Sequence, residues 1–260
     1  MAKICLDAGH GGKDPGATGY GRKEKDDVLK LTKKVGAILT NRGHSIVYTR
    51  TTDIYESPSA KAKEGNASGA AFFASFHRNS AKPEAAGHET LVYANTGKAK
   101  LCADAANKNM ASIGFKNRGT KIRTKLAVLR GTTMPAALFE TGFITNKSDN
   151  WLFDSRFNAI AQGYADAIEA AVGKGSGSGG SSSSNTSTSG SFTIKVSGVA
   201  KGDVLNIRSG AGANYKKTGE LKYNDPNKYT IVKTKKNGSD TWGKLKSGIG
   251  WINLKYTKRA

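Results

Sequence analysis

The sequence predicts an α/β domain with three layers and a mixed, mostly parallel sheet over residues 1–174, followed by a small all-β barrel over residues 192–260. Two observations support this division. Apolar strand-like runs alternate with amphipathic helical repeats in the first part, whereas the second part holds only short runs interrupted by Gly and Asn. Between them, residues 175–191 read GSGSGGSSSSNTSTSGS, with no charged and no apolar side chain. Because nothing in this segment can be buried, we expect a flexible linker that reaches about 20–25 Å.

In the first part, the apolar run at residues 3–7 predicts a short buried strand. Residues 24–42 carry apolar side chains at helical spacing and stop at Gly43, so they predict an amphipathic helix. The remaining elements expected are strands at 45–49, 71–76, 126–129 and 136–139, and helices at 98–113 and 155–172. The helix at 98–113 should bury one side, comprising Leu101, Cys102, Ala105 and Met110. Ligand sites of such α/β sheets gather at the carboxyl ends of strands.

In the second part, strands are expected at 204–208, 228–232, 242–246 and 250–252. Their apolar side chains predict the barrel core, comprising Leu205, Ile207, Trp251 and Ile252.

The composition is strongly basic, with 41 Lys and Arg against 20 Asp and Glu, a net charge of +21 at pH 7. Residues 191–260 are the more basic part, with 15 basic against 4 acidic side chains. This charge predicts a polyanionic partner, and nucleic acids, anionic membranes and anionic cell-wall polymers all satisfy that requirement. Neither a transmembrane run nor a secretory signal peptide is expected. Cys5 and Cys102 are interpreted as core thiols.

Three side chains in the first part have the chemistry of a catalytic zinc site. His10 lies in DAGHGG directly after the first strand, and His77 lies in SFHRN at the end of another. Glu24 opens the first helix. Two imidazoles and one carboxylate that leave a fourth position free are a catalytic zinc set.

Simpler interpretations of the same residues stay open on spacing alone. The three positions are 14 and 53 residues apart, which is no local motif. A strand-end histidine can be a polar loop residue, and Glu24 can simply be favoured by the helix dipole. Of the other histidines, His44 is expected to contact the end of the first helix, and His88 is expected to be exposed to solvent.

Glu140 ends an apolar strand abruptly in the segment PAALFETGFITN. A carboxylate that closes a buried strand is costly unless it faces a cleft or is paired. It is therefore a candidate general base, with a surface Glu at the start of a turn as the alternative. The segment GHGGKD is not a phosphate-binding loop, because Asp14 replaces the hydroxyl residue that should follow Gly-Lys, and no nucleotide site is expected.

Taken together, DAGHGGKDPGATG, Glu24, SFHRNS and PAALFETGFITNKSD resemble the zinc-dependent N-acetylmuramoyl-L-alanine amidases of the type 3 class, over residues 2–172. The resemblance implies one Zn²⁺ per chain with His10, Glu24 and His77 as ligands and Glu140 as the catalytic carboxylate. Arg78 departs from the family, which usually has a smaller or apolar residue there, so Arg78 and its neighbour Asn79 are expected to contact substrate. Only 62 residues separate His77 from Glu140, too few for the autoinhibitory helical insertion of some members, so the cleft is expected to be open.

The tail resembles a bacterial SH3-like cell-wall-binding domain over residues 193–258, through VLNIRSGAG, WGKL and GWI. Tyr215, Tyr223 and Trp242 are the candidates for its binding face.

These resemblances imply a peptidoglycan hydrolase that cleaves the amide bond between N-acetylmuramic acid and L-alanine without a covalent intermediate. A catalytic module joined to a basic wall-binding module, with no export signal, is typical of a phage endolysin made in the host cytoplasm and released to the wall through a membrane lesion. A mother-cell autolysin is the second interpretation. The expected partners are peptidoglycan and anionic wall polymers.

The alternatives from other classes are a non-catalytic wall-binding protein and a basic nucleic-acid-binding protein. The intact set of four residues argues against the first. The second would need basic side chains gathered on one face with stacking aromatics, whereas here they are scattered along the sequence.

Overall fold

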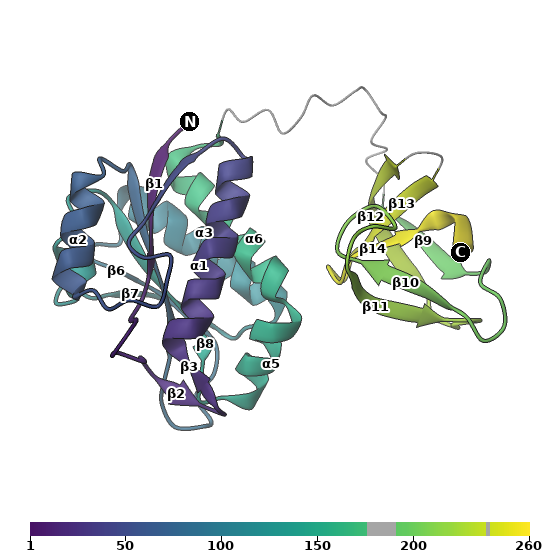
Figure 1. Ribbon diagram of the computed structural model, residues 1–260, viewed down its shortest axis with the longest axis horizontal. Helices are drawn as coiled ribbons and strands as arrows, with labels where there is room; N and C mark the ends of the chain where they lie inside the picture. The colour runs from purple at the N-terminus through teal and green to yellow at the C-terminus, as the bar shows by residue number, and fades with distance from the viewer. Residues whose placement is uncertain (176–190, 238–239) are drawn as a thin grey trace. The chain divides into compact units, whose positions relative to one another are not determined.

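The computed structural model describes residues 1–175, 191–237 and 240–260, which form two compact units (Figure 1). We call residues 1–175 the N-terminal unit and the described residues from 191 onward the C-terminal unit. The predicted linker lies outside the described residues except for its two ends. Within the described part, no helix combines the length and the apolar character needed to cross a membrane.

The N-terminal unit is built on a six-stranded sheet in the order β4-β1-β5-β8-β6-β7. Neighbouring strands are parallel except for β6, which is antiparallel to β8, so the sheet is mixed and mostly parallel. The strands are β1 (Lys3–Ala8), β4 (Ser45–Tyr48), β5 (Phe72–Asn79), β6 (His88–Val92), β7 (Asn117–Ile122) and β8 (Ala136–Phe143). A small hairpin of β2 (Thr18–Gly19) and β3 (Arg22–Lys23) leads into the first helix.

Helices cover both faces of this sheet, which gives the three layers expected (Figure 1). One face packs against α1 (Glu24–Asn41), α3 (Gly97–Ile113) and α6 (Phe157–Val172), and the other against α2 (Pro58–Ala67) and α4 (Ala127–Arg130). The helix α5 (Lys147–Ser155) follows β8. Side chains alternate along β5, so Phe72 and Phe76 belong to the larger core and Phe73 to the smaller one. Each buried phenylalanine contributes about 2 kcal/mol.

Several predicted elements were wrong. Residues 126–129 contribute to α4 rather than to a strand, because a four-residue apolar run does not distinguish a buried helical turn from a strand. The closing helix predicted at 155–172 is confirmed as α6, whereas the elements α2, α5, β6 and β7 were not predicted. Leu101 is 54% exposed, because α3 buries the stripe that contains Cys102 and Met110 instead. Cys5 and Cys102 are free and buried, as expected.

The C-terminal unit is an all-β structure with seven antiparallel strands in the order β11-β10-β14-β13-β12-β9-β15. They are β9 (Phe192–Val196), β10 (Val204–Arg208), β11 (Lys217–Lys222), β12 (Tyr229–Asn237), β13 (Asp240–Leu245), β14 (Trp251–Asn253) and β15 (Thr257–Arg259), with a 3₁₀ turn at Leu254–Tyr256. Leu205, Ile207 and Ile252 lie in its core as predicted, whereas Trp251 is only half-buried.

Candidate active site

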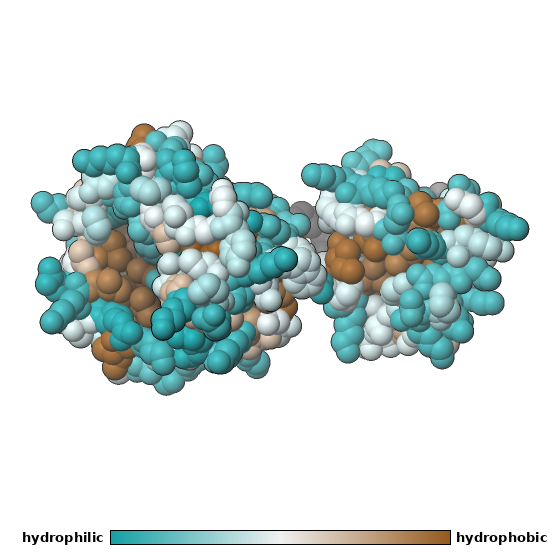
Figure 2. Space-filling model, turned by 90° about the horizontal axis from the view of Figure 1, so that it is seen from below, coloured by the Kyte–Doolittle hydropathy of each residue, from teal (hydrophilic) through white to brown (hydrophobic). Residues whose placement is uncertain are grey.

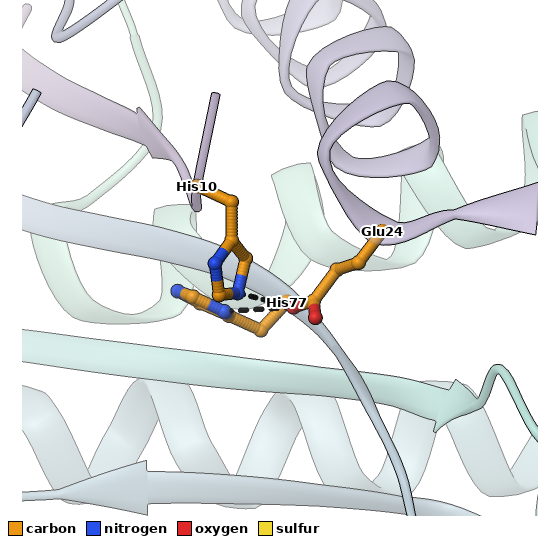
Figure 3. A group of neighbouring side chains, drawn as sticks. All are labelled: His10, Glu24 and His77. Carbon is orange, nitrogen blue, oxygen red and sulfur yellow. Dashed lines mark hydrogen bonds and ion pairs between the residues drawn. The ribbon is translucent and has the colours of Figure 1, made fainter. Parts of the chain in front are cut away.

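His10, Glu24 and His77 meet at the carboxyl edge of the sheet (Figure 3). His10 follows β1, His77 lies near the end of the neighbouring strand β5, and Glu24 is the first residue of α1. Glu24 Oε1 lies 3.1 Å from His10 Nε2 and 2.9 Å from His77 Nδ1. One potential ligand atom from each of the three residues lies within 4.8 Å of the other two. Two imidazoles and a carboxylate thus converge with the spacing that a single metal ion needs.

Two glycines make this close approach possible. A Cβ atom at Gly9 would collide with the His77 ring. At Gly16, where φ is +66°, a Cβ would come within 2.6 Å of His10 Cδ2 and 2.7 Å of Glu24 Oε2. The glycines of the first motif are therefore required by the packing of the three side chains as well as by the turn itself.

Neighbouring groups hold each of these side chains in one orientation. Asp14 Oδ2 lies 2.8 Å from His10 Nδ1, on the ring edge opposite the nitrogen that faces Glu24. The Glu24 carboxylate accepts backbone N–H bonds from Ala17 (2.8 Å) and Arg78 (3.0 Å). A carboxylate on the second nitrogen of a ligating imidazole is a usual feature of zinc sites. The sequence analysis did not predict this role of Asp14. A carboxylate four residues after His10 was the only indication of it in the sequence.

The electrostatics of the three residues are strongly coupled. Burial alone would lower the pKa of His10, but hydrogen bonds and negative charge from Glu24, and then from Asp14, raise it to about 9. Burial would raise the pKa of Glu24, yet the two histidines hold it well below its usual range. Glu24 is therefore ionised at neutral pH. Imidazoles ligate a cation only in their neutral form, so metal would compete with protons here.

Glu140 lies beside His77, as its register partner on β8. Burial raises the pKa of Glu140 to about 7; the charge of His77 opposes the shift, and Glu24 and Glu89 add to it. Its Oε2 atom is buried and has no hydrogen-bond partner among the residues that the structure describes. A carboxyl group with a pKa near neutrality and one unused oxygen can accept and return a proton at neutral pH.

The chain that carries these four residues is also similar in sequence to known proteins. The family model described as N-acetylmuramoyl-L-alanine amidase matches residues 4–170. The chain belongs to this family. The N-terminal unit is thus an amidase domain, a hydrolase of peptidoglycan.

Named relatives agree with this assignment. The chain is 43% identical over 179 residues to the endolysin of Bacillus phage SPP1, covering 65% of either chain. It is 38% identical over 177 residues to the sporulation-specific N-acetylmuramoyl-L-alanine amidase of Bacillus subtilis (strain 168), covering 66% of this chain and 68% of that one. Among solved structures, the amidase AmiC2 of Nostoc punctiforme is 34% identical with a TM-score of 0.60, covering 64% of this chain and 94% of its own. The chain thus matches about two thirds of the length of the phage and sporulation proteins.

In the amidase domain, a buried charge cluster supports the loop that carries His10. Asp7 of β1 is buried and accepts a hydrogen bond from Lys61 Nζ (2.9 Å). The same Nζ donates to the carbonyl oxygens of Ala8 (2.5 Å) and His10 (3.3 Å). Arg50 donates from Nε to the Ala8 carbonyl (3.0 Å) and from Nη2 to that of the following residue (2.8 Å). Nothing in the sequence indicated this role, because a lysine in a short helix normally faces solvent.

The prediction that Arg78 contacts substrate is wrong. Successive residues of a strand point to opposite faces, so Arg78 turns away from the site into which His77 points. Its guanidinium is buried, donates to Asp27 Oδ2 and Asn150 Oδ1 (both 2.6 Å), and lies 4.2 Å from the centre of the Phe153 ring. Only its backbone N–H serves the site, through Glu24.

Asn79, the other predicted substrate contact, lies at the end of β5, where its side chain is half-buried. Asn79 Nδ2 donates to Glu89 Oε1 (3.1 Å), and Arg118 Nε donates to Glu89 Oε2 (3.0 Å). Glu89 is in turn the register partner of Glu140 on β6. Polar side chains therefore extend from Glu140 through Glu89 to Asn79 and Arg118. A contact between Asn79 and substrate stays a prediction.

His88 is fully buried, which contradicts the expected exposure. It starts β6, the strand paired with β8, and its Nδ1 lies 3.0 Å from the Glu140 carbonyl oxygen and 3.2 Å from the Tyr164 hydroxyl. Burial lowers the pKa of His88 to about 3, against opposing hydrogen bonds. His88 is thus a neutral core residue that supports the backbone of Glu140.

The three candidates for wall binding differ in exposure. Tyr215 and Tyr223 are 47% and 45% exposed and are available to a ligand. Trp242, on β13, is only 5% exposed. Trp242 lines a pocket rather than an open face, and its role in wall binding stays a prediction.

Proposed function

We propose that the chain cleaves the amide bond between N-acetylmuramic acid and the L-alanine of the stem peptide, and that His10, Glu24 and His77 hold one zinc ion for this reaction. The observation that carries the proposal is the convergence of these three donors beside the unpartnered Glu140 Oε2. The donor set fits zinc, since two imidazoles and one carboxylate are a frequent set in zinc hydrolases.

A zinc ion held at this site supplies Lewis-acid polarisation of the scissile carbonyl and acidifies a water molecule. Glu140 accepts the proton of the attacking water as its oxygen bonds to the carbonyl carbon. Glu140 then returns this proton to the alanine nitrogen as the C–N bond breaks. The pKa of Glu140, raised to about 7, suits both transfers. Asp14 and the backbone donors to Glu24 keep the ligands aligned throughout.

For the C-terminal unit we propose an SH3-like fold and a wall-binding role. Its 15 basic against 4 acidic residues favour attraction to anionic wall polymers, and the exposed Tyr215 and Tyr223 are candidate contacts to the wall itself. Attachment through the Gly/Ser segment would raise the effective concentration of the amidase domain at its substrate.

We further propose that the protein is a phage endolysin, made inside the host cell and acting on the wall after release. Its similarity to the SPP1 endolysin supports this role. The similarity to the sporulation-specific amidase keeps a mother-cell autolysin as the second candidate.

The activity is tested by digesting purified walls and measuring soluble amino groups and reducing sugars in parallel. An amidase releases amino groups in proportion to lysis and no reducing sugars, whereas a glycosidase releases reducing sugars. Zinc content is measured in the same preparations. Lysis that releases only reducing sugars would refute the proposal, as would an active enzyme that contains no metal.

A further inference from the structure

The C-terminal unit contains a pocket of about 510 Å³ beside β10, within the size range of small-ligand sites. It is lined by residues of the segment before β10, by β10 itself, by the start of β13 and by the 3₁₀ turn. Figure 2 shows that the otherwise hydrophilic surface of this unit also carries an apolar area. A concave site with both apolar and polar walls is thus present in a unit whose proposed role so far rests on its charge and on two exposed tyrosines.

The charge of this pocket is opposite to that of the unit. Only four acidic residues lie in 191–260, and two of them, Asp203 and Asp240, line the pocket. Arg208 is the one basic residue among those that line the pocket. Its Nη1 donates a hydrogen bond to the Tyr215 carbonyl oxygen (2.9 Å). The lining therefore has a net charge of −1 inside a strongly positive unit, so the pocket favours a cation more than the surrounding surface does.

Both carboxylates are available to such a cation. Asp203 is exposed, and within residues 191–237 and 240–260 Asp240 accepts a bond only at Oδ2, from Asn253 Nδ2 (2.8 Å). Neither forms an ion pair in the part of the chain that the structure describes, although 15 basic residues lie in the same unit.

The aromatic part of the lining suits an alkyl chain that ends in a positive charge. Trp242 and Tyr256 both line the pocket, the first nearly buried and the second 38% exposed. Aromatic faces attract cations and cover methylene groups. Asn206 lines the same pocket and has a buried Oδ1 without a hydrogen-bond partner among the described residues, so a small rotation of its amide would add one acceptor.

We propose that this pocket binds a primary ammonium group carried on a short peptide, with Asp203 and Asp240 as acceptors and with Trp242 and Tyr256 covering its alkyl or peptide stem. The inference deepens the proposed wall-binding role, because wall peptides expose free amines wherever cross-links have not formed. The basic remainder of the unit would attract wall anions, and the pocket would select the peptide.

The experiment titrates the full-length protein by calorimetry with two probes. Nα-acetyl-Ala-Lys-Ala amide offers a side-chain ammonium, and triglycine amide offers a main-chain amino terminus. The counterpart of each probe with that amine acetylated is the control. We expect one ammonium probe to bind and its acetylated counterpart not to bind, and the probe that binds identifies the source of the amine. Binding of neither probe, or equal binding of the acetylated forms, would overturn the proposal.

A variant carrying Asp203→Asn and Asp240→Asn should weaken binding roughly tenfold, the sum expected for two partly exposed ion pairs. The control variant Glu220→Gln with Asp225→Asn removes the same two charges outside the pocket and should change affinity by less than about threefold. An equal loss in both variants would show a general charge effect and contradict the site. If the double variant does not fold, Asp203→Asn alone gives the same test, because this exposed side chain has no bond within the described residues.

Wall sedimentation and hydrolysis of a small soluble muropeptide are measured on the same samples. Wild-type protein that sediments with walls and hydrolyses the muropeptide, but binds neither probe, would refute the pocket and leave the proposed function standing. Failure of wall binding or hydrolysis by the wild type would refute the proposed function itself.

Discussion

In the N-terminal unit, charged side chains near the site are buried and paired, as Lys61 is with Asp7 and Arg78 with Asp27. In the C-terminal unit, 15 basic residues face 4 acidic ones, and Lys217–Glu220 is the one ion pair among its described residues. Buried pairs determine local geometry and are screened little by salt, whereas unpaired surface charges act at longer range and are screened strongly. Under the proposed function, the two units therefore use charge for different purposes, one to position a reaction and the other to attract a surface.

The largest effect expected in the N-terminal unit follows loss of a metal ligand. His77→Ala should contain much less than one zinc per chain and should lose wall hydrolysis, because two donors hold the ion far more weakly than three. The zinc content of the purified variant measures the first effect, and the release of amino groups from walls measures the second. His44→Ala removes a histidine outside the cluster and should keep its zinc. Full zinc occupancy in the His77 variant would exclude this residue as a ligand.

A somewhat smaller effect is expected at the general base. Glu140→Gln keeps the shape of the side chain, so zinc should stay bound while turnover falls roughly 100-fold or more. Glu89→Gln, at the neighbouring position on β6, should lower turnover much less. Lysis at the wild-type rate by the Glu140 variant would place the proton acceptor elsewhere.

Lys61 and Asp7, which support the loop that carries His10, should affect zinc binding by positioning this ligand rather than by contacting the metal or the substrate. Lys61→Met should lower zinc affinity about tenfold, on the scale of other outer-shell changes, and Lys61→Arg should restore part of it. Lys63→Met, on the exposed side of the same helix, is the matched control. Because an unpaired buried Asp7 can destabilise the fold, the double variant Lys61→Met with Asp7→Asn is measured as well. Wild-type zinc affinity in a folded Lys61→Met protein would contradict the role.

The salt concentration should affect the activities of the two units differently. Lysis of whole cells by the full chain should fall as salt rises, because the exposed positive charges are screened within about 8 Å at physiological ionic strength. Residues 1–174 alone should hydrolyse small muropeptides at a rate that salt changes little. If this fragment lyses cells as well as the full chain at every salt concentration, the C-terminal unit is not a targeting module.

The smallest effect expected is on stability in mild acid. The folded pKa of His88 is lowered to about 3, whereas an unfolded histidine titrates near 6.5. Between these values the unfolded chain binds a proton that the folded chain does not, so stability falls on acidification, by at most about 1.4 kcal/mol per pH unit. Urea unfolding of the metal-free Glu140→Gln protein from pH 6.5 to 4.5 measures this slope, because Glu140, with a folded pKa of about 7, would otherwise contribute a slope of opposite sign over the same range. His88→Gln should flatten it, and an unchanged slope would assign the effect to another group.

Sequence alone determined the fold class of the amidase domain and the four residues at its centre. Alternating strands and helices bring strand ends to one edge, where His10 follows β1 and His77 lies near the end of β5. The expectation that Glu140 ends its strand was wrong, because β8 continues to Phe143. Short-range patterns also identified α1 and the core thiols, because amphipathic spacing depends on residues close in the chain.

Only the tertiary structure decided which polar residues are buried and what they contact. Arg78, His88 and Lys61 all look like surface residues in the sequence, yet each is buried against groups 50 or more residues away. Likewise, Asp203 and Asp240 are 37 positions apart and share one pocket because β10 and β13 both pair with β14. The free energy of burying a polar group depends on such distant partners, and local sequence does not specify them.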